Sequence, residues 1–186
     1  MPSTLFRVTA VVLALLSFVA SATVVVYETI DDMARRVPVI VRGKVTRSVA
    51  GWDDHKRRIW TWTEVMVSES IKGKTGAVVL VKQPGGEVDG IGQAVAGTAR
   101  FVEGEDCVLF LEPAPDEPTT FRTTGLSAGK VLIADWRGQS AALRNTDGIS
   151  FAAPTGKKVE LVRSPEFLGA PADFIARVRA AQGGAQ

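Results

Sequence analysis

The stretch IWTWTEVMVSESIKG, from Ile59 to Gly73, decides the fold class. Alternate residues of a strand point to opposite faces. One face of this stretch carries Ile59, Thr61, Thr63, Val65, Val67 and Ile71, and the other carries Trp60, Trp62, Glu64, Met66, Ser68 and Ser70. The first set is β-branched throughout and suits a barrel interior, so the pattern predicts one long strand with two tryptophans on its outer face.

Further apolar runs on both sides of this stretch predict a series of strands. VIVRGKVTRSV (39–49) precedes it, with Gly43 at a bulge or bend. AVVLVKQP (77–84) and DCVLFLEP (106–113) follow, and after the loop APDEPTT (114–120) come FRTTGLSAG, KVLIADWRG, SAALRN and ISFAAP. The absence of βαβ alternation argues against a parallel doubly wound sheet. We therefore expect a mainly β fold.

Two segments have the periodicity of amphipathic helices. YETIDDMARR predicts a short helix at about 27–36, stopped by Pro38, and APADFIARVRAAQ predicts a C-terminal helix at about 171–182. The second helix places Phe174, Ile175 and Val178 on one face. A helix of this length needs tertiary packing. Trp60 and Trp62 offer it an apolar surface, so the two rings are either covered by this helix or a hairpin, or they form a partner face.

The N-terminus has the order of regions of a secretory signal. Arg7 precedes an apolar run that ends near Val19, and Ala20, Ser21 and Ala22 supply small residues. We expect cleavage after Ala22, a single domain at 23–186 and a barrel at about 38–163. The apolar run is diluted below the roughly 20 residues of a membrane span. A secreted or periplasmic protein without stable membrane insertion is expected.

Composition disfavours several functions. The chain has 22 basic and 20 acidic side chains, which gives no electrostatic footprint for nucleic acid. Cys107 is the only cysteine, which excludes an intramolecular disulfide and a cysteine-based zinc site. Its acidic neighbours Glu105 and Asp106 do not favour a thiolate, so a buried, inert side chain is expected.

No complete catalytic or metal-binding set is evident, and no cofactor is expected. His55, the only histidine, follows Asp53 and Asp54, but neighbouring residues of an extended chain diverge, and a metal needs three or more converging ligands. GLSAG (125–129) resembles a nucleophile elbow around Ser127, yet β formers follow where a helix is required. A turn between strands is the favoured interpretation.

The glycine-rich segment GGEVDGIGQAVAG (85–97) predicts a flexible or tightly bent connection. It misses the dinucleotide fingerprint because Val95 occupies the third glycine position. Loops of this kind shape partner sites. Glu87 and Asp89 are therefore candidate binding residues together with Trp60 and Trp62.

Several motifs together resemble a family of exported bacterial proteins of myxobacterial type that has no assigned activity. They are PVIVRGKV, IWTWTEVMVSESIKG, QPGGEVDGIGQAVAG, FVEGEDCVLFLEP and TGLSAGKVLI. The resemblance covers most of residues 23–186. It implies export and the extent of the domain, and it brings no catalytic residues.

The order of the motifs is also similar to the OB-fold domain of netrin-like modules and tissue inhibitors of metalloproteinases. A strand containing RGKV, a polar loop, a long strand ending in IKG and a later glycine-rich segment carry this likeness. It implies an OB-like barrel of five strands, or a larger one. Those inhibitors chelate zinc through an N-terminal cysteine, whereas the expected mature N-terminus here is Thr23.

The leading expectation is a non-catalytic exported β-barrel domain that binds a protein or cell-envelope component. One alternative is an extracytoplasmic hydrolase, which requires Ser127 and His55 within hydrogen-bond reach. Another is a secreted protease inhibitor acting without the zinc-binding cysteine. Carbohydrate binding is a variant of the leading expectation and requires exposed, coplanar rings at Trp60 and Trp62.

Overall fold

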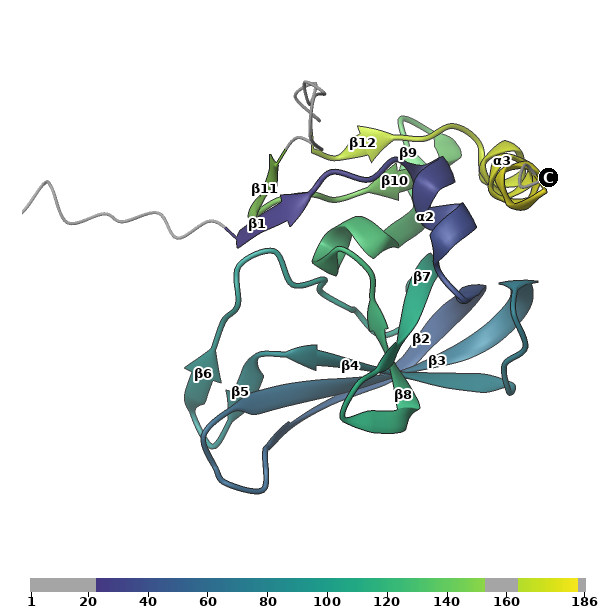
Figure 1. Ribbon diagram of the computed structural model, residues 1–186. Helices are drawn as coiled ribbons and strands as arrows, with labels where there is room; N and C mark the ends of the chain where they lie inside the picture. Colours follow the sequence, from purple (N-terminus) through teal and green to yellow (C-terminus); the bar gives the residue numbers. More distant parts are fainter. Residues whose placement is uncertain (1–22, 153–163, 184–186) are drawn as a thin grey trace, which may run out of the picture.

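The computed structural model describes residues 23–152 and 164–183. The expected signal peptide at 1–22 and the last part of the expected barrel, 153–163, lie outside the described residues. Within them the protein is mainly β, as predicted (Figure 1). In chain order the elements are β1 (Thr23–Val26), α2 (Ile30–Arg36), β2 (Val39–Trp52), β3 (Ile59–Lys72), β4 (Val78–Pro84), β5 (Gly86–Val88), β6 (Ile91–Gln93), β7 (Asp106–Ala114), β8 (Glu117–Thr123), the 3-10 helix η1 (Leu126–Gly129), β9 (Lys130–Trp136), β10 (Gln139–Arg144), β11 (Ile149–Ala152), β12 (Glu166–Phe167) and α3 (Pro171–Gln182).

Most strands belong to one sheet in the order β12-β10-β9-β7-β2-β3-β4-β8. β7 shares one edge between two neighbours: its first half pairs with β9 and its second half with β8. β8 also pairs in parallel with β4, where Val81 lies opposite Phe121. In Figure 1 the strands β2, β3, β4, β7 and β8 form the lower part of the molecule, below the helices and β9 to β12.

Two hydrophobic clusters lie on opposite sides of β7. One contains Val41, Val45, Val65, Val81, Leu109 and their neighbours from β2, β3, β4 and β7. The other joins the sheet to the helices through Ile30, Met33, Ile40, Phe110, Phe174 and Val178. Successive residues of a strand face opposite ways, so Leu109 enters the first cluster and Phe110 the second.

The stretch that begins at Ile59 forms a single strand, β3, as predicted. Thr63 and Val65 are buried and Met66 is exposed, in agreement with the assignment of its two faces. Ile71 is the exception, because it packs in the cluster beneath the helices. The pairing skips it, with Ile40 opposite Lys72 and the next β2 residue opposite Ser70. This bulge turns the side chain away from the remainder of its predicted face.

α2 begins at Ile30 and not at residue 27 as predicted. The Tyr27 N–H donates to the Ala152 carbonyl, which continues the parallel β1–β11 pairing and keeps Tyr27 extended. The Thr29 side chain then accepts a hydrogen bond from the Asp32 N–H and caps the helix.

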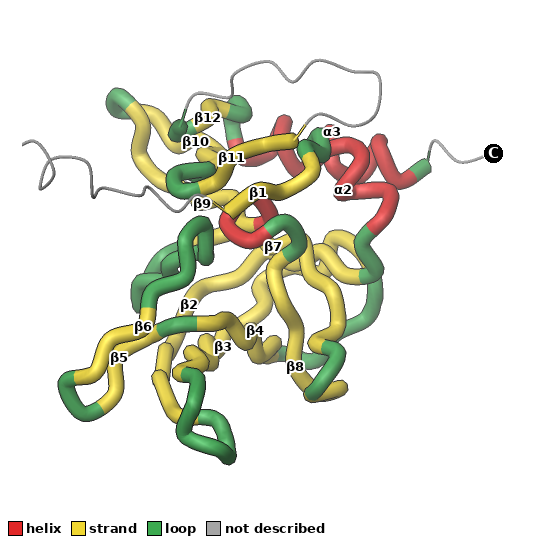
Figure 2. The backbone as a smooth tube through the Cα atoms, turned by 60° about the vertical axis from the view of Figure 1, so that its left-hand side comes forward, coloured by secondary structure: helices red, strands yellow, loops and turns green. Residues whose placement is uncertain are grey.

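α3 spans Pro171–Gln182, as predicted, and packs beside α2 (Figures 1 and 2). Phe174 is 1% exposed and lies among Ile30, Met33 and Phe110. The interpretation of this helix as a cover for Trp60 and Trp62 is therefore wrong. Its apolar face packs instead against α2 and the cluster that joins the sheet to the helices. No helix in the described part of the chain is long and apolar enough to cross a membrane.

Two segments interpreted as loops contain strands. The glycine-rich segment forms the β5–β6 hairpin, whose turn uses Asp89 and Gly90 at φ +52° and +75°. Both residues are tolerant of this left-handed conformation and favour such turns. The expected loop at 114–120 is also shorter, because β8 begins at Glu117 and turns back along β7.

Candidate ligand-binding site

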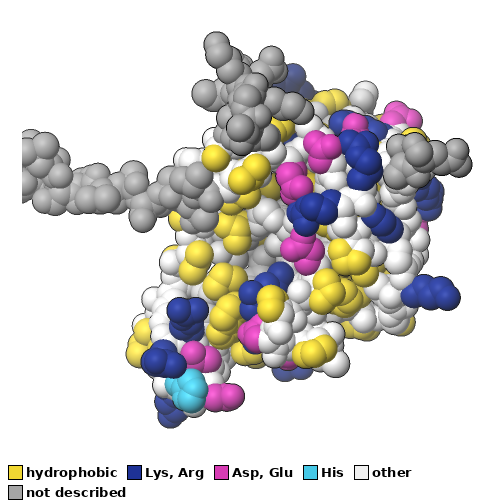
Figure 3. Space-filling model, in the orientation of Figure 1, with side chains coloured by type: hydrophobic (Ala, Val, Ile, Leu, Met, Phe, Trp, Pro, Cys, Tyr) yellow, Lys and Arg dark blue, Asp and Glu magenta, His cyan; other side chains and the backbone are white. Residues whose placement is uncertain are grey.

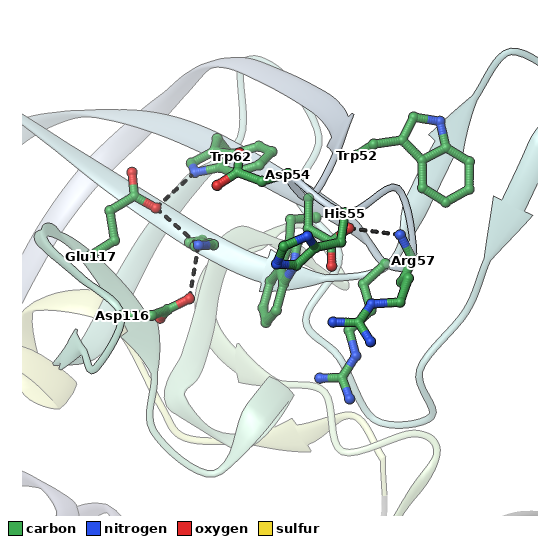
Figure 4. A pocket seen from close by; sticks show the side chains of 11 residues that line it. Trp52, Asp54, His55, Arg57, Trp62, Asp116 and Glu117 are labelled. Atoms are coloured by element: carbon green, nitrogen blue, oxygen red, sulfur yellow. Dashed lines mark hydrogen bonds and ion pairs between the residues drawn. The ribbon is translucent and has the colours of Figure 1, made fainter.

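A pocket of about 790 Å³ opens on the outer face of β3 and β4. Residues 53–58, between β2 and β3, and residues 115–116, between β7 and β8, flank it. Its lining combines Trp52, Trp60 and Trp62 with Asp53, Asp54, Asp116 and Glu117, and with His55, Arg57, Arg58 and Lys82. Figure 4 shows Asp116 and Glu117 on one side of the pocket, with Trp52 and Arg57 on the other.

The pairing of β3 with its neighbours places the two adjacent tryptophans on the pocket floor. Trp62 lies opposite Val49 of β2 and Lys82 of β4. A Cβ atom at Gly51 would lie 3.3 Å from Cζ3 of Trp62, so the ring passes close over this glycine. Trp60 and Trp62 are both partly buried, and both remain accessible in the pocket, as the outer-face prediction requires.

Lys82 forms the centre of the site. It is only 8% exposed, and its Nζ lies 4.9 Å from the ring centroid of Trp60 and 5.5 Å from that of Trp62. Asp116 and Glu117 each pair with this ammonium group at 3.0 Å. A cation over aromatic faces and between carboxylates is held by both kinds of contact.

These contacts also set the charge state of the site. Burial lowers the pKa of Lys82, but the hydrogen bonds and charges of Asp116 and Glu117 outweigh burial, so the net shift is upward. The hydrogen bond from Lys82 is the main reason that the pKa of Asp116 is lowered. Arg122, whose guanidinium carbon lies 5.2 Å from the Trp60 centroid, also pairs with Asp116. The ammonium group and this carboxylate are therefore both charged at neutral pH.

Asp53 organises the turn between β2 and β3. Its carboxylate accepts a hydrogen bond from the Arg57 N–H at 2.7 Å, which is the main cause of its lowered pKa. Its own N–H donates to the Arg58 carbonyl at 2.8 Å. By contrast, the side chains of Asp54, His55, Arg57 and Arg58 make no hydrogen bond or ion pair with the described part of the chain. The turn is therefore ordered by its backbone and presents unpaired polar groups to the pocket.

The candidate binding residues fall into two groups. Trp60 and Trp62 line the pocket, whereas Glu87 and Asp89 are exposed on the β5–β6 hairpin and do not line it. The sequence interpretation missed Lys82, although a lone charge in the apolar run AVVLVKQP was a usable signal.

The structure does not bring Ser127 and His55 together. Ser127 lies in η1, and its buried hydroxyl has no hydrogen-bond partner among the described residues. His55 is exposed on the β2–β3 turn and lines the pocket; Figure 3 shows it in cyan at one tip of the molecule. The pair needed for a serine nucleophile is therefore not assembled. Residues 125–129 form a turn between strands, as predicted, and no cluster of metal-binding side chains occurs in the described ranges.

Cys107 is fully buried in β7, as expected. Burial is the main cause that raises the pKa of its thiol to about 12. The nucleophilic thiolate is therefore scarce in the native state.

We expect Cys107 to react with a thiol reagent only when the chain opens. At pH 8, labelling with an aromatic disulfide reagent should be at least about 100-fold slower in native buffer than in denaturant, because reaction needs both exposure and deprotonation. Stopped-flow absorbance measures both rates. Equal rates would contradict the buried position.

The fold and the site define a β-rich protein with an aromatic and charged pocket on one sheet face. The sequence matches no protein-family model, and no curated protein is similar to it at a significant level. The chemistry and position of the pocket are therefore the basis of a functional proposal.

Proposed function

We propose that this chain is a non-catalytic, exported OB-like binding domain, and that the pocket on β3 and β4 receives a protein or cell-envelope component. The signal-like N-terminus motivates the proposed export. The position of an open pocket relative to the strand order carries the proposed binding role.

The strand pairings support an OB-like barrel. β2, β3 and β4 pair in sequence as antiparallel neighbours, β4 pairs in parallel with β8, β8 pairs with β7, and β7 returns to β2. This cycle of five strands agrees with the five-stranded Greek-key arrangement of OB folds. β9, β10 and β12 then extend the sheet from the free half of the β7 edge.

The position of the pocket supports the proposed binding role, because OB folds bind ligands at one defined face. Those folds use the face of their second and third strands and the loops that join strands one to two and four to five. The corresponding elements here are β3, β4, residues 53–58 and residues 115–116. Every residue that lines the pocket belongs to these elements or to the strand ends that adjoin them.

A cosedimentation experiment tests the proposal. Residues 23–186 are mixed with insoluble cell-envelope material from the organism that produces the protein, and the bound fraction is compared with that of a Trp60→Ala/Trp62→Ala variant. Stacking on an aromatic ring contributes roughly 1–3 kcal/mol, so removal of two rings should weaken binding by at least about tenfold. The chain has two further tryptophans, Trp52 and Trp136.

Trp136→Ala is the matched control, because Trp136 lies on β9 and does not line the pocket. It should retain wild-type binding. Circular dichroism establishes that each variant is folded. Equal retention of the double variant and the control, or no retention of the folded wild-type protein, would contradict the proposal.

A further inference from the structure

The charges of the pocket restrict the class of ligand. The lining holds four carboxylates and three cations, and Arg122 beside it pairs with Asp116, so the site carries no net formal charge with His55 neutral. A groove for single-stranded nucleic acid is positively charged along the phosphate backbone. The site lacks this positive excess, because Lys82 and Arg122 are paired with its carboxylates, so its charge favours a neutral ligand over a polyanion.

The unpaired polar groups of the lining include both acceptors and donors. The Asp54 carboxylate offers only acceptors, while the guanidinium groups of Arg57 and Arg58 offer only donors. None of the three side chains has a hydrogen-bond partner in the described residues. A hydroxyl group both donates and accepts. A ligand with several neighbouring hydroxyls can therefore satisfy this mixed set.

The pocket floor is preorganised for stacking. The Lys82 ammonium lies over the rings of Trp60 and Trp62 and is itself held by two carboxylates. The Trp62 indole N–H also donates to Glu117 at 3.4 Å. Rings fixed before binding lose little conformational freedom when a ligand arrives. The volume of about 790 Å³ lies within the range of roughly 300–1,000 Å³ typical of sites for small ligands.

We propose that the pocket binds a neutral oligosaccharide segment of an envelope or extracellular polysaccharide. This inference rests on the proposed binding function and specifies its ligand class. Sugar rings stack on Trp60 and Trp62, and their hydroxyls bond to Asp54, Arg57 and Arg58. Aromatic surface gives most of the affinity, and the unpaired polar groups orient the sugar.

Titration of the ¹⁵N-labelled domain tests this assignment. The probes are chitohexaose, cellohexaose, xylohexaose and laminarihexaose at millimolar concentrations, and a thymidine dodecamer represents single-stranded nucleic acid. At least one hexasaccharide should shift the indole N–H signals of Trp60 and Trp62 and leave that of Trp136 unchanged. The four tryptophans give four such signals, so the pocket and its internal control are read in one spectrum.

Two variants sharpen the test. Trp62→Ala should weaken binding of the responding hexasaccharide by roughly 5- to 150-fold, as expected for the loss of one stacking platform. Asp54→Ala should also weaken it, by roughly 2- to 10-fold, because one hydrogen-bond acceptor is lost. Since Asp54 is exposed and unpaired, this second variant tests recognition without a change in folding.

The outcomes separate this inference from the proposed function. Tryptophan-dependent envelope binding without any hexasaccharide response would leave the binding function standing and overturn the sugar assignment. Tighter binding of the thymidine dodecamer, with a steep dependence on salt, would also overturn it in favour of nucleic acid. Sugar shifts that spare Trp60 and Trp62 would place the site elsewhere and contradict both.

Discussion

The Phe174→Ala variant should lose about 3–5 kcal/mol of unfolding free energy, which is typical for truncation of a fully buried phenylalanine. Phe174 is 1% exposed and packs with Ile30, Met33 and Phe110, so truncation removes contacts to α2 and to β7. α3 is short and depends on these contacts to remain helical. Urea denaturation monitored by far-ultraviolet circular dichroism measures the loss.

Arg179→Ala is the matched control on the same helix. Arg179 is exposed and pairs with Glu69, and an exposed ion pair contributes at most about 1 kcal/mol. A Phe174→Ala variant no less stable than this control would contradict the docking of α3 against α2. The folded fraction of Phe174→Ala should retain its tryptophan pocket, because α3 does not cover Trp60 or Trp62.

The sequence predicted α3 itself but not the surface beneath it. The spacing of Phe174, Ile175 and Val178 is a local property of the chain, so the helix bounds could be inferred from periodicity. The surface against which it packs includes Ile30 and Phe110, which are far away in sequence. Both this surface and the outer face of β3 are apolar enough to pack against α3, and only the three-dimensional arrangement shows which of them does so.

The candidate site was predictable to a similar degree. Period-two alternation was sufficient to place Trp60 and Trp62 on one outer face, because strand geometry fixes the direction of alternate side chains. This alternation could not predict Asp116 and Glu117 as pocket residues, because they reach the pocket through the pairing of β7 with β8 and of β8 with β4. Glu87 and Asp89 were predicted from their position in the glycine-rich segment, and the β5–β6 hairpin places them outside the pocket.

The bend of β2 is the second feature with a large expected effect on stability. Gly43 lies at a register shift between β2 and β3, as the sequence predicted. An added Cβ would lie 2.5 Å from the Met66 carbonyl oxygen and 2.7 Å from Cγ1 of Val65. The Val65 methyl group can move, but the carbonyl belongs to the backbone of the neighbouring strand. An alanine at position 43 therefore forces the two strands apart.

Gly43→Ala should reduce the free energy of unfolding by about 3 kcal/mol, at the upper end of the range for overpacked interiors, because a side-chain rotation cannot relieve the backbone contact. Urea denaturation measures the change, and an unaltered slope would show that the same surface unfolds. Gly92→Ala is the control, since its Cβ meets no atom within 4 Å and its change should stay within about 0.5 kcal/mol. Equal stability of the two variants would show that β2 and β3 lie further apart at the bend. Because both strands also carry tryptophans of the pocket, a destabilised Gly43→Ala variant should lose ligand binding over the same urea range in which it unfolds.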